Sequence, residues 1–370
     1  MKYSKVNNYL GWAVFLIATI VYMLTLEETT SLWDCGEYIT TSVGLEVGHP
    51  PGAPFFMMLG RLFSAFSSPE NAAYMVNAMS ALSSSGTILF MFWTLTMLGR
   101  KLSLTTRGTI DTASTVAIFG SAAVGALSYM FTDSFWFSAV EGEVYAMSSF
   151  FTALVVWAIF KWEVETDEHD ADILEKGETT ARPNRWLIFI AYMIGLSIGV
   201  HLLNLLAIPA IAFVIYFKKY KEIDLKSFVL TGIIGVGVLG FVQAFLIPQI
   251  PSFADVFERF FTNTLGMPFN TGFVIFVLTL TAGLTYGMYS TSRKAPKNNI
   301  DILVFGLFVT FISFAILPAA FAVITIAVAI LLYFKFSFGP KIIWNNIIVG
   351  FTMLIIGYST FAMIVIRSNA

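Results

Sequence analysis

Long apolar runs separated by short polar stretches occupy almost the whole chain, and this pattern predicts a bundle of membrane-spanning helices. A helix that crosses a bilayer needs about 20 mostly apolar residues. We expect about eleven such spans, at residues 9–26, 73–98, 112–131, 144–160, 186–201, 204–217, 228–247, 271–290, 301–317, 318–334 and 342–366. The run at 53–66 is shorter and contains Arg61, so we expect an interfacial helix there rather than a span.

The basic residues fall almost entirely on one side of this arrangement. With the N-terminus in the cytoplasm and residues 27–72 as one long external loop, 18 of the 21 Lys and Arg residues are cytoplasmic. Cytoplasmic loops of membrane proteins carry such an excess. Only Arg61, Arg259 and Arg367 remain outside, and counting 53–66 as a span would destroy the asymmetry. We therefore predict a multi-pass protein with a cytoplasmic N-terminus.

Composition supports the membrane assignment and excludes several other classes of protein. Hydrophobic residues make up 57% of the 370 and charged residues 12%, with a mean hydropathy of +0.78, whereas soluble domains are about 25% charged. The net charge of −2 offers no basic surface for nucleic acid. The single cysteine, Cys35, excludes an intramolecular disulfide and a cysteine-based metal site. We predict an all-α polytopic membrane protein with a single domain over residues 1–370.

Two further features concern the organisation of the chain. Residues 161–185 form a polar stretch with eight acidic and four basic residues, which we expect to be a solvated cytoplasmic linker. The sequence ends three residues after Arg367, directly behind the last expected span. If it is part of a longer protein, we expect an external C-terminal domain to be missing from it.

The first group of candidate site residues lies in the predicted external loop, between residues 31 and 56. Asp34 and Glu37 are three residues apart, so on a helix they share a face and can point into one site. His49 is followed by Pro-Pro-Gly, which breaks the chain and fixes its direction. Loops that concentrate such residues commonly carry function.

A second group precedes the span at 144–160. Glu141 and Glu143 are two residues apart, so on a helix they would face different ways. We expect only one of them to enter the site and favour Glu143. The alternative is an interfacial anchor, in which Trp136 and Tyr145 belong to the aromatic belt of the membrane.

Two further external positions carry candidate polar residues. His201 and Asn204 lie at a tight turn between spans, where a structural hydrogen-bonding role is the alternative. Arg259 is one of the three external bases, and a salt bridge with Asp255 or Glu258 is the alternative for it.

Three segments together resemble the GT-C superfamily of glycosyltransferases: WDCGE at 33–37, HPPGAP at 49–54 and AVEGEVY at 139–145. The sequence is most similar to protein O-mannosyltransferases and their multi-span bacterial relatives, over most of the chain. Those enzymes usually carry a base shortly after His-Pro-Pro, whereas the nearest here is Arg61. The resemblance implies a polyprenyl-phosphate-linked sugar donor, an acceptor hydroxyl on protein Ser or Thr, and an active site on the periplasmic face of a bacterial inner membrane.

The expected chemistry assigns roles to these residues. A hydroxyl acceptor is a weak nucleophile and needs a positioned base, which we assign to Asp34. Its attack opposite the departing phosphate would invert the anomeric carbon. Glu143 and Glu37 would orient the acceptor or Asp34, and Glu37 could instead help to hold a divalent cation, Mg²⁺ or Mn²⁺. The candidates for binding the substrate and its phosphate are Arg259, His49, Arg61, His201, Asn204 and Glu141, since the leaving group needs cations or donors.

Other functions remain open at this point. A glycolipid or lipid A acceptor would suit the same scaffold. A flippase for lipid-linked sugars would share the helices, but it would place ionisable residues near the middle of the membrane, and the predicted spans are almost free of charge. A non-catalytic assembly factor of the envelope is the third alternative. Membrane lipids are expected partners in every case, and nucleic acid in none.

Overall fold

The computed structural model describes residues 3–220, 222–292 and 341–368, which form helices and no strand. The helices are α1 (Tyr3–Leu24), α2 (Cys35–Gly44), α3 (Pro54–Ser64), α4 (Ala72–Arg107), α5 (Thr112–Met130), α6 (Asp133–Val140), α7 (Val144–Lys176), α8 (Asn184–Ile198), α9 (Ala207–Lys219), α10 (Leu225–Phe241), α11 (Ile247–Arg259), α12 (Thr271–Ser292), α15 (Lys341–Tyr358) and α16 (Ala362–Ser368). Short 3-10 or π segments are η1 (Pro69–Asn71), η2 (Leu202–Leu206), η3 (Val242–Leu246), η4 (Phe260–Thr264) and η5 (Ser359–Phe361).

The prediction of an all-α polytopic membrane protein is confirmed. Among the described residues, eight helical runs are long and apolar enough to cross a membrane. Every expected span in this part of the chain coincides with a helix, although α8 has only 15 residues. The expected spans at 301–317 and 318–334 lie outside the described residues.

The chain divides into two compact units. The first unit contains Met1–Leu239 and Met353–Ala370, and the second contains Gly240–Thr352. In the second unit, Phe253 on α11 packs with Phe276 on α12. The Glu258 carboxylate accepts the backbone N–H groups of Asn270 (2.6 Å) and Phe273 (2.9 Å), which closes the turn between η4 and α12.

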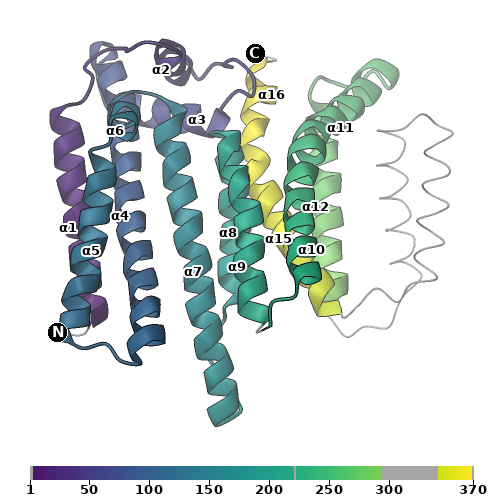
Figure 1. The fold of residues 1–370 in the computed structure, drawn as a ribbon. Coiled ribbons are helices and arrows are strands. Elements are labelled where there is room, and N and C mark those ends of the chain that lie inside the picture. The colour runs from purple at the N-terminus through teal and green to yellow at the C-terminus, as the bar shows by residue number, and fades with distance from the viewer. Residues whose placement is uncertain (1–2, 221, 293–340, 369–370) are drawn as a thin grey trace. The chain divides into compact units, whose positions relative to one another are not determined.

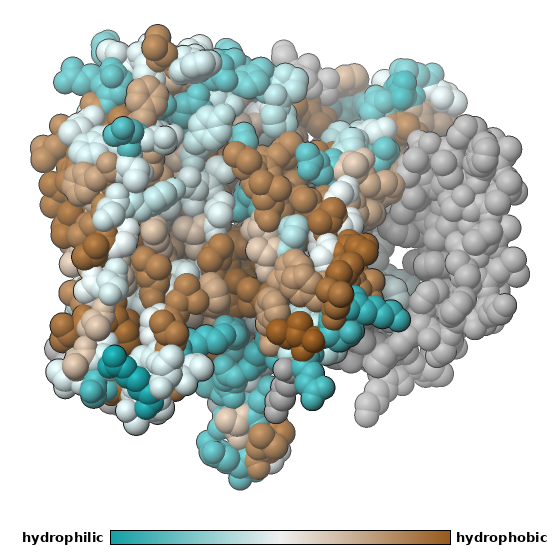
Figure 2. Space-filling model, in the orientation of Figure 1, coloured by the Kyte–Doolittle hydropathy of each residue, from teal (hydrophilic) through white to brown (hydrophobic). Residues whose placement is uncertain are grey.

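Helix α4 lies at the centre of the first unit and contacts α1, α5 and α7. Its buried positions are rich in small residues, among them Ala78, Ala81, Ser84 and Ser85. Small side chains let helix backbones approach closely in a membrane, where packing rather than the hydrophobic effect holds helices together. Figure 2 shows apolar residues over the middle of this unit and hydrophilic residues at its two ends.

The ends of the first unit differ in structure. Helices α2, α3 and α6 lie at the end opposite the N-terminus, which we call the loop end (Figure 1). The short apolar run at 53–66 is helix α3, as predicted, and its 11 residues are too few for a span. The backbone N–H groups of Phe55 and Phe56 donate to the carbonyl of Gly199 (2.8 and 3.3 Å), which joins the start of α3 to the end of α8.

At the opposite end of the unit, α7 continues as a helix to Lys176, where the sequence predicted a solvated linker. Three acidic residues of this extension each bind a different helix, so ion pairs order the polar stretch. The pairs are Lys101 of α4 with Glu163, Arg185 of α8 with Glu165, and Lys218 of α9 with Asp167. The pattern of charges in the sequence does not distinguish a helix held by ion pairs from a solvated linker, because the basic partners lie on other helices.

Candidate functional site

A Glu37–His49–Asp34 cluster occupies the loop end. One oxygen of Glu37 accepts the backbone N–H of His49 at 2.7 Å, and the other lies 3.1 Å from His49 Nδ1. The second ring nitrogen, Nε2, lies 3.9 Å from an oxygen of Asp34. The structure therefore brings the predicted residues Asp34, Glu37 and His49 together around one imidazole.

The Pro-Pro-Gly turn explains how His49 returns to α2. The N–H of Gly52 donates to the carbonyl of His49 at 2.8 Å, and Gly52 adopts a φ of 95°, which favours glycine. The ring of Tyr38 lies 5.6 Å from the His49 ring, between it and Phe56 of α3. The turn and this aromatic contact hold the imidazole beside the first turn of α2.

Asp34 occupies the position directly before α2 but does not use its carboxylate to cap the helix. Aspartate at this position usually accepts a backbone N–H of the first turn. Here the side chain is 59% exposed, and its described contact is with His49. The carboxylate is thus accessible to a substrate. In Glu37, by contrast, the hydrogen bond from the His49 backbone lowers the pKa, so Glu37 remains ionised.

Glu141 and Glu143 are both buried, at 5% and 4% exposure, which corrects the expectation that they lie on a helix and face different ways. The reason is that both residues are extended rather than helical, and alternate residues of an extended chain point to the same side. Glu141 accepts a hydrogen bond from Ser31 of the loop. Glu143 caps α7 by accepting the N–H of Val144 at 3.2 Å.

The pKa of Glu143 is raised to about 7, chiefly because the side chain is buried. The negative charges of Glu141 and Asp34 raise it further, and His49 opposes them. The charges of the Glu37–His49–Asp34 cluster therefore act on Glu143. A carboxyl group with such a pKa exchanges its proton near neutral pH, as catalytic acids and bases do.

Asn77 is a residue of the site that the sequence analysis did not identify. It lies on α4 with no exposed surface, and its amide donates to the carbonyls of Glu27 (2.7 Å) and Thr29 (2.9 Å). The Glu27 N–H in turn donates to Val140 before the Glu141 segment. An asparagine inside an apolar span was the available signal, since such a residue needs a polar partner.

Among the basic residues of the first unit, Arg61 and Arg367 contact the end of α2 that is farther from Asp34. Arg61 donates to the carbonyl of Val43 at 2.8 Å, near the other end of α2, and Arg367 donates to Leu45 at 2.8 Å. With a rise of 1.5 Å per residue, Leu45 lies about 16 Å along the helix from Asp34. Arg259 lies in the second unit, where it pairs with Asp255 at 2.6 Å, as its alternative role predicted.

His201 and Asn204 take part in local structure at the turn after α8. His201 Nδ1 accepts the N–H of Leu203 at 3.2 Å, and its ring lies 5.2 Å from that of Tyr145. Burial lowers the pKa of His201. Asn204 accepts a hydrogen bond from Thr152 at 2.9 Å, and its amide nitrogen is buried with no partner in the described structure. Their roles in binding substrate stay predictions.

Within the described ranges, no three His, Cys, Asp or Glu side chains are arranged to hold a metal ion. The Glu37 oxygens, which could have served a divalent cation, both face His49.

Comparison with known proteins identifies relatives. Residues 34–224 match the model of the family described as the protein O-mannosyl-transferase TMEM260 N-terminal domain. The chain is 25% identical over 245 residues to protein O-mannosyl-transferase tmem260 of Dictyostelium discoideum, covering 64% of this chain and 27% of the relative. It is 27% identical over 157 residues to TMEM260 of Mus musculus, covering 42% and 20%. It thus spans about a quarter of the length of these relatives. No solved structure matches the chain.

Proposed function

Because the chain belongs to the protein O-mannosyl-transferase TMEM260 N-terminal domain family, we propose that it is a membrane glycosyltransferase that moves a sugar, mannose in the relatives' names, onto a protein hydroxyl. The observation that carries this proposal is the exposed, uncapped Asp34 beside the fixed His49 at the loop end. The relatives' names supply the reaction class, and the cluster supplies a base where a substrate can reach it.

The proposed step is an inverting displacement. The acceptor Ser or Thr oxygen attacks the anomeric carbon, and its proton passes to the Asp34 carboxylate. The new carbon–oxygen bond forms as the bond to the donor phosphate breaks, and the phosphate leaves with the electron pair. Attack from the face opposite the leaving group inverts the anomeric configuration.

Glu37 and Glu143 support this step in different ways. Glu37 uses both oxygens to hold His49, so we assign it a positioning role. With Nδ1 of His49 against Glu37, Nε2 faces Asp34 and the space in which the leaving phosphate would lie. Glu143, whose pKa is near 7, can donate a hydrogen bond to a sugar or acceptor hydroxyl in its neutral form.

The proposal extends to the donor and the side of the membrane. From the resemblance to GT-C glycosyltransferases we propose a polyprenyl-phosphate-linked sugar donor, with its sugar at the membrane surface and its tail among the apolar helices. The uneven distribution of basic residues favours a loop end that faces away from the cytoplasm. In a bacterial inner membrane, this side is the periplasm.

The experiment that tests the reaction class identifies the product. The purified full chain is incubated with polyprenyl-phosphate mannose and, in parallel, with Ser/Thr peptides or membrane glycolipids. We expect mannosylated peptide with a configuration at the anomeric carbon opposite to that of the donor. Retention of configuration would refute the single displacement. Product in the glycolipid reaction alone would refute the protein acceptor, and movement of intact donor across vesicles without product would favour the flippase.

A further inference from the structure

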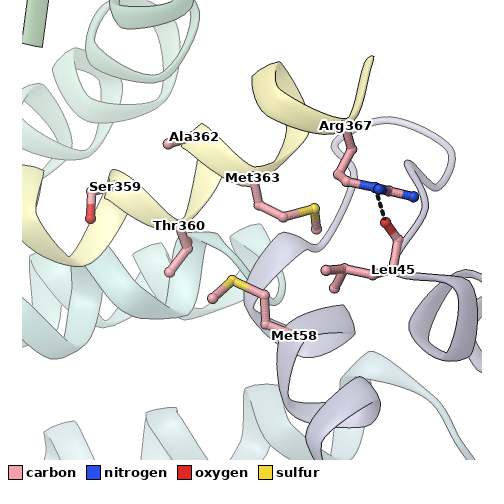
Figure 3. A pocket seen from close by; sticks show the side chains of 7 residues that line it. All are labelled: Leu45, Met58, Ser359, Thr360, Ala362, Met363 and Arg367. Atoms are coloured by element: carbon pink, nitrogen blue, oxygen red, sulfur yellow. Dashed lines mark hydrogen bonds between the residues drawn. The ribbon is translucent and has the colours of Figure 1, made fainter. Parts of the chain in front are cut away.

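A pocket of about 420 Å³ in the first unit lies at the far end of α2 from Asp34 (Figure 3). Three separate segments form it. Leu45 follows α2, Met58 belongs to α3, and η5 with α16 contributes Thr360, Met363 and Arg367.

The lining has an apolar part and a cationic part. The side chains of Met58 and Met363 project into the pocket from different helices, and Arg367 lies at its edge (Figure 3).

Arg367 retains capacity to bind an anion. Its Nε donates to Leu45, and one terminal nitrogen lies 3.5 Å from the carbonyl of Gly44. The side chain is exposed and forms no ion pair among the residues that the structure describes. Guanidinium groups bind phosphate strongly because they offer several donors in a planar arrangement.

The placement of the pocket suits a lipid. Met363 belongs to the candidate span Trp344–Val365, and Arg367 follows directly after it. An apolar pocket between the end of this candidate span and α3, with an arginine at its edge, matches a molecule that has a phosphate group on an apolar chain.

We propose that this pocket binds the phosphate of an anionic glycerophospholipid, with an acyl chain against Met58 and Met363. The reacting donor is a poor fit, because Leu45 lies about 16 Å along α2 from Asp34, whereas a base and the leaving phosphate flank a single anomeric carbon. The bound lipid would join α16 to the end of α2 and so stabilise the loop end.

The test measures the thermal unfolding temperature of the full chain in detergent with added phosphatidylglycerol. We expect wild type to gain several degrees, and Arg367→Gln to need about tenfold more lipid for the same gain. Ala362→Trp keeps the arginine but fills the pocket, and we expect it to lose the gain as well. Arg107→Gln is the matched control, since this exposed arginine lies at the opposite end of the unit, and it should respond as wild type does.

Three results would overturn the proposal. An equal gain in wild type, Arg367→Gln and Ala362→Trp would place the lipid elsewhere. A gain reproduced by inorganic phosphate alone would indicate a free-anion site. A gain with polyprenyl phosphate but none with phosphatidylglycerol would assign the pocket to the sugar donor. The proposal can fail separately from the enzymatic function, because Asp34→Asn should leave lipid binding unchanged.

Discussion

Glu37 holds His49 at two points, by its backbone N–H at 2.7 Å and by its ring Nδ1 at 3.1 Å. This double contact fixes both the position of the Pro-Pro-Gly turn and the orientation of the imidazole. The ring nitrogen Nε2 is consequently aimed at Asp34, the residue to which we assign the proton transfer. Glu37 is therefore expected to act on the reaction indirectly, by holding the His49 imidazole in place.

Glu37→Gln should lower kcat by about tenfold to a hundredfold with little change in KM. The reason is that a His49 imidazole that is no longer held in place aligns less well with the reacting groups. The glutamine oxygen can still accept one hydrogen bond but carries no charge for the imidazole. Steady-state mannose transfer to peptide measures the effect. Glu46→Gln, an exposed residue of the same loop, is the control. Equal rates for Glu37→Gln and wild type would remove Glu37 from the site.

Glu143 should make stability depend on pH. Its pKa is raised from 4.5 to about 7 in the folded protein, so the folded state retains a proton that the unfolded state has lost between these values. The contribution of this group to stability is therefore fully present below pH 4.5 and is lost as pH rises toward and through 7, a fall of about 3 kcal/mol. Glu143→Gln should flatten the fall in unfolding temperature between pH 5 and pH 8. If the unfolding temperature of Glu143→Gln changed with pH as that of wild type does, the raised pKa of Glu143 would be contradicted.

Glu165 should contribute strongly to stability at the other end of the unit. Its carboxylate accepts the Arg182 backbone N–H at 2.9 Å, Nη2 of Arg185 at 3.0 Å and the indole N–H of Trp186 at 2.6 Å. Glu165→Gln removes the charge from this part-buried network, whose Arg185 side chain is exposed, and should cost about 1 kcal/mol. Thermal unfolding measures the loss, with the exposed neighbour Glu168→Gln as control. A similar unfolding temperature for both variants would show that the network is dispensable.

Asn77 should hold the loop near the site. Asn77→Ala removes the hydrogen bonds to the carbonyls of Glu27 and Thr29, and we expect faster limited proteolysis of residues 27–33 together with reduced transfer. Ser84→Ala is the matched control on the same helix, because its buried hydroxyl has no partner in the described structure and its removal should be nearly neutral. Unchanged proteolysis of Asn77→Ala would exclude the anchoring role.

The sequence allowed accurate prediction of features that depend on local composition. Apolar runs located the long described helices but not α2, α6 or α11, and the length of the 53–66 run distinguished α3 from a span. The spacing of Asp34 and Glu37 anticipated a shared site, since these two residues lie at the start of one helix. Such features follow from periodicity and length, which are properties of a short segment.

Features that depend on distant contacts were not predictable in the same way. The extended segment that contains Glu141 and Glu143 packs closely on α4, where a Cβ at Gly142 would lie 2.9 Å from the Asn77 oxygen, and this contact joins residues far apart in the sequence. The helical continuation of α7 forms ion pairs with partners from three other helices, which lie far from it in the sequence. Arg61 was a plausible phosphate ligand by charge, but only the structure shows that it binds Val43 at the far end of α2 from Asp34.

The most direct test of the proposed function compares Asp34→Asn with Asp133→Asn, an exposed aspartate that begins α6 at the same loop end. Both proteins are purified as the full chain, checked for the same unfolding temperature, and assayed for mannose transfer from polyprenyl-phosphate mannose to a Ser/Thr peptide. With Asp34 as the base, Asp34→Asn should lose at least about a hundredfold in kcat, while Asp133→Asn should remain close to wild type. Equal transfer by wild type and both variants would contradict the assignment of the base to Asp34.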